Sequence, residues 1–234
     1  MKNKAVIGIV VALIVLYFIR KKMKSENSQL KTSAKKIGKL GKKKDSESFI
    51  ETQKWWNGEK SLIEVPEKIK PIFDFLVDEE GFSRKAVWDV NAWRIGYGSD
   101  TITTRLDGDF RKVKQGDTTT EKLAQKDLER RLRTDFENVL KKQLTEETYN
   151  SLPLEAKIAL NSMAYNYGSI TKKRIREAVQ KANKGEMTWE RVAEIWKEET
   201  VNDNKKLSEK MRQALFERRK REAEIIKHSG EYDN

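Results

Sequence analysis

The sequence predicts an α+β domain, mostly α, with a small antiparallel sheet, preceded by a single N-terminal transmembrane helix and a basic tether. Three observations predict this organisation. An uncharged apolar run opens the chain, apolar residues recur at helical spacing through most of the sequence from residue 61, and that spacing is interrupted over residues 86–104. The predicted divisions are 1–20 for the anchor, 21–60 for the tether and 61–234 for the folded domain.

The composition restricts the kinds of catalytic site that the chain can build. Its 234 residues include no cysteine and one histidine, His228, close to the end. Cysteine-ligated zinc and a cysteine nucleophile are excluded, and a Ser-His-Asp triad or a multi-histidine metal centre is disfavoured, because each needs an imidazole in a folded cleft. We therefore expect the chemistry to come from carboxylates, amides or hydroxyls, with no metal and no cofactor.

Residues 5–19 form the one segment that is apolar enough to enter a membrane. Lys4 and Arg20 flank this run of 15 residues. At about 1.5 Å per residue it covers roughly 22 Å, so spanning a hydrocarbon core of about 30 Å requires the flanking cations to snorkel and the bilayer to thin locally. A buried core helix and a cleaved signal are the alternatives, and the basic run that follows disfavours cleavage. We expect the lipid bilayer to be a partner through these residues.

Nearly all of the net charge of +12 lies between residues 20 and 44, which hold 11 basic residues and one acidic residue. Residues 61–234 hold 34 basic and 32 acidic residues, and this near-neutral balance disfavours a DNA-reading domain. We expect the tether to lack a fixed fold and to bind anionic lipid headgroups or nucleic acid inside a particle, with a solvated spacer as the alternative. The charge asymmetry predicts the N-terminus outside and the body inside.

Within the folded domain, helical spacing predicts a first helix over residues 65–80, with Pro66 in its first turn and Gly81 after its end. Residues 86–104 carry aromatic and apolar residues among glycines, which predicts short antiparallel strands joined by turns. Residues 118–121 offer a capping box for a long charged helix that reaches about Lys142. Further helices are predicted at 154–167, 171–183, 188–199 and 205–227, with Gly168 and Gly185 as helix stops.

Glu80 and Asp89 are the candidate catalytic pair. Glu80 closes the first predicted helix directly before Gly81, and Asp89 follows in the predicted sheet. Glycoside hydrolysis uses one carboxylic acid to protonate the leaving oxygen and a second carboxylate to stabilise the cationic state or to activate water. The partial negative charge at a helix C-terminus suits a carboxyl group that must hold a proton. Glu79 would take this role in a different helix register, but no glycine follows it.

The run Glu80-Gly81, then Asp89, then Ile-Gly-Tyr-Gly at 95–98 resembles the active-site signature of phage-type lysozymes, the muramidase group of phage endolysins. Glycines in these strands would let a bulky sugar polymer approach the backbone. Further similarities follow in the family's order: Gly116-Asp117-Thr118-Thr119 with Ala124 and Asp127-Leu128, the segment 152–168, and Leu215, Arg218, Arg219 and Glu222.

The resemblance implies a lysozyme-like fold and cleavage of the bond between N-acetylmuramic acid and N-acetylglucosamine in peptidoglycan. It implies that Glu80 is the general acid and that Asp89 is the carboxylate across the scissile bond. It also places Tyr165 and Asn166 along the saccharide groove, although Tyr165 equally suits a core position. Three aromatic residues are candidates for stacking on sugar rings or for packing: Tyr97, which we take as substrate-binding, Trp88 and Trp93.

The sequence departs from the family pattern near Asp89. Ala92 stands where the family has glycine, Arg94 where it has the threonine that helps to position water, and Ser99 where it has histidine. The loss of that threonine leaves a lytic transglycosylase open as a second function. An inactive wall-binding or virion structural protein is a third.

Taken together, these features predict a phage-encoded, membrane-anchored peptidoglycan hydrolase. Its expected location is the virion membrane of a membrane-containing phage, from which it opens the wall during infection. The host inner membrane and a role in lysis are the alternative.

Overall fold

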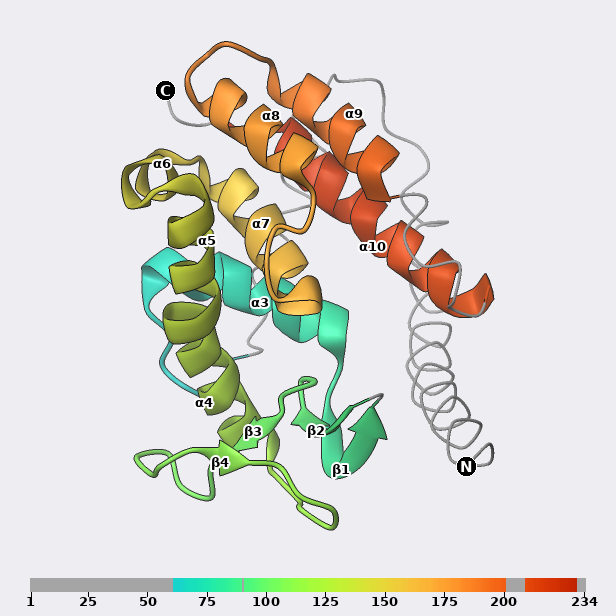
Figure 1. The fold of residues 1–234 in the computed structure, drawn as a ribbon. Helices are drawn as coiled ribbons and strands as arrows, with labels where there is room; N and C mark the ends of the chain where they lie inside the picture. Colours follow the sequence, from blue (N-terminus) through green and yellow to red (C-terminus); the bar gives the residue numbers. More distant parts are fainter. Residues whose placement is uncertain (1–60, 90, 201–208, 231–234) are drawn as a thin grey trace, which may run out of the picture. The chain divides into compact units, whose positions relative to one another are not determined.

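The computed structural model describes residues 61–89, 91–200 and 209–230 (Figure 1). These residues fall into two compact units. The first contains residues 61–63 and Glu80–Asp127, and the second contains Glu64–Glu79 and the described residues from Leu128 onward. The predicted anchor and tether lie outside the described residues. In the part of the chain that is described, no helix combines the length and apolarity needed to cross a membrane.

Two small antiparallel pairs of strands form the sheet structure of the first unit, which confirms the prediction for residues 86–104. Strand β1 (Ser83–Asp89) pairs with β2 (Ala92–Gly96), with Trp88 opposite Trp93 and Asp89 opposite Ala92. Strand β3 (Thr101–Ile102) pairs with β4 (Arg111–Lys112). The sequence gives no sign of β4, because both of its residues are charged and exposed.

The β1–β2 hairpin has one face in a core and one face away from it. Side chains alternate along a strand, and residues directly opposite each other share a face. On one face, Trp93 packs with Ala86 against the buried cluster of Ile95, Ile102 and Val113. Asp89 lies on the other face, because it directly follows Trp88, the partner of Trp93. Val87, two residues before Asp89, shares this second face with its own partner Arg94. The hairpin therefore presents Asp89 and Arg94 on the same side, away from its core.

Residues 117–119 hold the two strand pairs together. The Ala86 backbone N–H donates to the Asp117 carbonyl at 2.9 Å, and the Thr119 N–H donates to the Arg84 carbonyl at 2.9 Å. The Asp117 carboxylate in turn accepts hydrogen bonds from both terminal nitrogens of Arg111, at 2.7 and 2.8 Å. Asp117 therefore fastens β4 to β1 through its side chain and its backbone at once.

The Arg111–Asp117 pair, called the clasp below, predicts that the stability of the protein falls at acid pH. The hydrogen bonds from Arg111 lower the pKa of Asp117 from 3.8 to about 2. Because the folded pKa lies below the unfolded value, the contribution is complete above pH 3.8 and is lost as the pH falls to about 2. We expect Asp117→Asn to lower the urea midpoint at pH 5, and the difference from wild type to vanish near pH 2.

Asp107→Asn is the matched control for that experiment, since Asp107 forms an exposed pair with Arg105 at 3.6 Å and fastens no strand. A difference between wild type and Asp117→Asn that stayed constant from pH 5 to pH 2 would contradict the clasp.

Gly96 allows the hairpin to pack closely on helix α4 (Glu121–Arg131). It is buried at a φ of +64°, and a Cβ built on it would lie 2.6 Å from the Ala124 Cβ. Such a separation is shorter than any real Cβ contact, so a side chain here would push the hairpin from the helix. The expectation that glycines leave room for sugar is therefore wrong for Gly96, whose neighbour is a helix.

We expect Gly96→Ala to destabilise the protein by about 1–3 kcal/mol more than Gly116→Ala. Gly116 also has a positive φ, +87°, but a Cβ there would meet nothing within 4 Å. The pair of variants thus separates steric clash from backbone strain in thermal unfolding. Equal losses of stability in the two variants would show that the contact with Ala124 is unimportant.

The second unit is helical. After the 3₁₀ turn η1 (Glu67–Ile69) and α3 (Lys70–Glu80), its elements are the π-helical segment η2 (Leu132–Phe136), α5 (Glu137–Leu144), α6 (Glu146–Ser151), α7 (Leu154–Tyr167), α8 (Lys173–Asn183), α9 (Trp189–Thr200) and α10 (Glu209–Lys227). Helix α9 lies beside both α8 and α10, and α10 also packs on α7 (Figure 1). Helix α7 is buried along nearly its whole length.

The helix predictions are largely confirmed, with two corrections. The long helix expected after residue 118 begins at Glu121 and is divided by η2. The Leu123 N–H donates to Thr120 Oγ1 at 3.3 Å, so Thr120 caps the helix and the predicted capping box at 118–121 does not form. The short α6 was not predicted.

A buried polar cluster joins three helices of the second unit. Glu222 on α10 is fully buried and accepts a hydrogen bond from Trp196 Nε1 on α9 at 3.1 Å. It also accepts from Ser162 on α7 and pairs with Arg218 and Arg219. The Arg-Arg-x-x-Glu spacing singled out in the sequence therefore places two guanidinium groups and one carboxylate at a single junction.

Candidate functional site

Glu80 is the last residue of α3, as the sequence predicted. Its side chain is half-buried, and Gly81 follows at a φ of +66°, a left-handed conformation that ends the helix and leads into β1. The chain therefore turns from α3 into β1 directly after Glu80.

The neighbouring Glu79 is held in a different interaction. Its two carboxylate oxygens accept from Arg221 Nε and Nη2, each at 2.7 Å, and its side chain is 12% exposed. Because this bidentate pair ties α3 to α10, the helix register in the structure gives Glu79 a packing role. Glu79 therefore takes part in a contact between two helices of the second unit.

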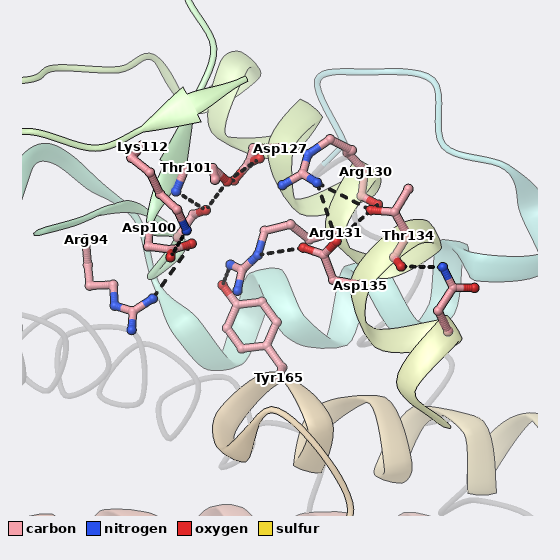
Figure 2. Close-up of polar contacts among 12 residues, drawn as sticks. Arg94, Asp100, Thr101, Lys112, Asp127, Arg130, Arg131, Thr134, Asp135 and Tyr165 are labelled. Atoms are coloured by element: carbon pink, nitrogen blue, oxygen red, sulfur yellow. Dashed lines mark hydrogen bonds and ion pairs between the residues drawn. The ribbon is translucent and has the colours of Figure 1, made fainter. Parts of the chain in front are cut away.

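Asp89 is the last residue of β1, and its side chain is 58% exposed. The Arg94 Nε lies 4.0 Å from Asp89 Oδ2, and the Arg94 Nη1 lies 4.0 Å from Asp100 Oδ1. Asp100 is in turn paired with Lys112 at 2.6 Å (Figure 2). These four charges alternate in sign, so the candidate catalytic carboxylate stands at the open end of a short charged row.

Tyr97 lies inside the first unit. It is 2% exposed, its hydroxyl donates to Glu121 Oε1 at 3.1 Å, and it accepts from Gln125 Nε2 at 3.4 Å. Its ring centroid lies 5.9 Å from that of Phe82. Stacking on a sugar needs an exposed ring face, so this burial favours the packing alternative for Tyr97.

The sequence left stacking on a sugar ring or packing open for Trp88 and Trp93, and the two residues differ in the structure. Their rings meet edge to face with centroids 5.6 Å apart. Trp93 is half-buried against the sheet core, whereas Trp88 is 45% exposed. Trp88 is therefore the aromatic residue of this hairpin whose ring can meet a ligand.

Tyr165 and Asn166 belong to the second unit, near the end of α7. The half-buried Tyr165 accepts a hydrogen bond from Arg131 Nη1 at 3.4 Å (Figure 2). The Arg131 guanidinium lies 5.0 Å from the ring centroids of both Tyr165 and Phe136. Asn166 is exposed. Tyr165 is thus held firmly by a cation and a second ring, while Asn166 faces solvent.

Sequence reasoning missed Arg131 and Asp100. Neither residue stands out in the sequence, because its place in the site comes from a contact with another part of the fold. Arg131 contacts Tyr165, and Asp100 contacts Arg94. Over the ranges that the structure describes, no group of three or more His, Asp or Glu side chains is arranged to hold a metal ion.

One comparison with known proteins gives a match. The family model described as phage lysozyme matches residues 77–222, which is more than half of the chain and includes all five candidate site residues. No curated protein and no solved structure matches the chain.

Proposed function

Since this chain belongs to the phage lysozyme family, we propose that its peptidoglycan-lytic activity is that of a muramidase, which hydrolyses the β-1,4 bond between N-acetylmuramic acid and N-acetylglucosamine. The observation that carries the proposal is the placement of Glu80 at the end of α3 and of Asp89 at the end of β1, nine residues later. Both residues fall within the matched region.

In the proposed reaction, Glu80 donates its proton to the oxygen that leaves as the glycosidic bond breaks. The negative charge of Asp89 stabilises the positive charge that develops on the sugar ring, and a water molecule completes the hydrolysis. Glu80 then regains its proton from that water. The exposure of Asp89 supports this role, because its carboxylate is accessible from solvent.

Arg94 favours a second candidate, a lytic transglycosylase. At the position where the family carries a threonine hydroxyl, this chain has a guanidinium 4.0 Å from Asp89 Oδ2. Without that hydroxyl to hold water, the sugar's own hydroxyl attacks the anomeric carbon as Glu80 protonates the leaving oxygen, and the carboxylate of Glu80 then takes the proton of the attacking hydroxyl. The ring closes without water and yields an anhydro-muramic end.

The identity of the new sugar ends distinguishes these reactions. Purified peptidoglycan is digested with the full chain and with Asp89→Asn, and the products are identified by mass spectrometry before and after borohydride reduction. A muramidase yields reducing N-acetylmuramic acid ends, and the Asp89→Asn variant loses them. A transglycosylase yields anhydro ends. No cleavage by the wild type would indicate an inactive wall-binding or virion structural protein.

We also propose that residues 5–19 anchor the enzyme in a bilayer, with the virion membrane as its location. The support is the uncharged run itself and the basic residues that follow it. Alkaline carbonate extraction should leave the protein in the membrane fraction, and protease treatment of intact particles tests the virion location. Recovery of the protein from lysing cells alone would contradict a virion role.

The basic residues between 20 and 44 supply the proposed contact with anionic lipid or nucleic acid. Vesicles with and without anionic lipid, and a DNA duplex at low and high salt, separate these two partners. No salt-sensitive binding to either would leave the tether a solvated spacer.

A further inference from the structure

Arg94 lies on β2, the second strand of the β1–β2 hairpin. It shares a face with Asp89, on the opposite strand and two residue pairs away, because Asp89 is paired with Ala92 and Arg94 with Val87. Its side chain is 30% exposed, so the guanidinium is partly withdrawn from water. The long side chain of Arg94 therefore extends across the hairpin toward Asp89, the proposed catalytic carboxylate.

The Arg94 guanidinium lies within ion-pair distance of two carboxylates. Its Nε and Nη1 atoms lie 4.0 Å from Asp89 Oδ2 and from Asp100 Oδ1 respectively. Asp100 is itself held by Lys112 at 2.6 Å (Figure 2). The far end of the charged row is therefore anchored by a short ion pair, and its near end reaches Asp89.

Asp89 has little else to hold it among the described residues. It ends a strand, its side chain is 58% exposed, and among the described residues its carboxylate has one ion pair, that with Arg94. An exposed carboxylate without such a partner samples several rotamers, whereas catalysis requires it in one place.

We propose that Arg94 is a positioning residue, which holds the Asp89 carboxylate in its working orientation and is itself held by Asp100 and Lys112. This inference rests on the proposed function, because it gives the charged row a purpose only if Asp89 acts on the substrate. Arg94 itself need not touch the sugar.

The test compares Arg94→Gln, Arg94→Lys and Asp100→Asn in the full chain, with soluble peptidoglycan fragments as substrate. The control is Arg105→Gln, which breaks another Arg–Asp pair of the same unit, at 3.6 Å. Binding of the same fragments is measured separately in the Glu80→Gln background, where the substrate is not consumed. Thermal unfolding of each variant reports any change in folding.

We expect Arg94→Gln to lower kcat by about tenfold, with KM and fragment binding changed by less than about twofold. Arg94→Lys should recover most of the lost rate, because it restores the cation. Asp100→Asn should lower kcat by about threefold alone, and should have no further effect when Arg94 is already glutamine. Arg105→Gln should match the wild type.

Three results would overturn the inference. Unchanged kcat in Arg94→Gln would show that Asp89 needs no support, and a loss of fragment binding equal to the loss of rate would make Arg94 a substrate contact. A fall in unfolding temperature that accounts for the lost activity would make its role structural. In each case the wild type still cleaves the substrate, so the proposed function survives. A wild type that does not cleave contradicts both.

Discussion

Replacing Glu80 by glutamine lowers the rate of peptidoglycan cleavage by about 10²–10⁴-fold in our account. The amide has nearly the same size and polarity as the carboxylic acid but has no acidic proton to give to the leaving oxygen. Because Glu80 ends a helix directly before Gly81, the substitution leaves the local backbone in place. The measurement is the release of soluble sugar from purified peptidoglycan by equal amounts of folded protein.

Glu79→Gln is the matched control for this prediction, because it makes the same chemical change one residue earlier. Glu79 is paired with Arg221, and a glutamine at this position can still accept a hydrogen bond from the guanidinium, so the loss of stability should be about 1 kcal/mol. We expect this variant to cleave at a rate within about threefold of wild type. If Glu79→Gln lost the activity and Glu80→Gln kept it, the acid would be Glu79.

Replacing Glu222 by alanine should destabilise the second unit by about 3–5 kcal/mol, because two buried guanidinium groups then lack their counter-charge. Arg218 and Arg219 are 7% and 1% exposed, and Glu222 is fully buried between them. Burial raises the pKa of Glu222, and the two arginines oppose that effect by stabilising the charged form. Urea unfolding followed by the fluorescence of Trp196, which donates to Glu222, measures the change.

Glu224→Ala controls for the loss of a glutamate on the same helix. Glu224 is exposed and pairs with Lys227 at 3.6 Å and His228 at 3.4 Å. We expect it to change stability by less than about 0.5 kcal/mol. Similar losses in the two glutamate variants would mean that the buried cluster contributes nothing specific.

The sequence predicted those elements whose boundaries are set by local chemistry. Helix α7 has the predicted bounds because Pro153 precedes it and Gly168, at a φ of +79°, follows it. The β1–β2 hairpin was predicted from its aromatic residues and glycines. In both cases the residues that decide the structure are close together in the chain.

The missed features either fit several neighbouring residues equally well or depend on partners that are far away in the sequence. The capping residue of α4 is Thr120, one of three consecutive threonines, and the pattern alone does not select among them. The burial of Tyr97 depends on Glu121 and Gln125, which are 24 and 28 residues away. A tyrosine between glycines has the same local pattern whether it packs in a core or faces a ligand.

For the candidate site, Glu80 was located correctly at the end of α3 because a helix stop is a local signal. The charged row beside Asp89 was not predicted. It requires the pairing of β1 with β2, which sets Arg94 on the face of Asp89, and the pairing of β3 with β4, which brings Lys112 to Asp100. The register of these strand pairs is set when the chain folds, so the sequence pattern alone did not show which charged residues would become neighbours.

The most direct test of the central claim is the appearance of new sugar ends when the full wild-type chain is incubated with purified peptidoglycan, beside the double variant Glu80→Gln, Asp89→Asn. We predict that the wild type produces reducing N-acetylmuramic acid ends that increase with time, and that the double variant produces none. Wild-type protein that is folded and leaves the glycan intact, or a double variant that cleaves as fast as the wild type, would contradict the assignment of these two carboxylates to the reaction.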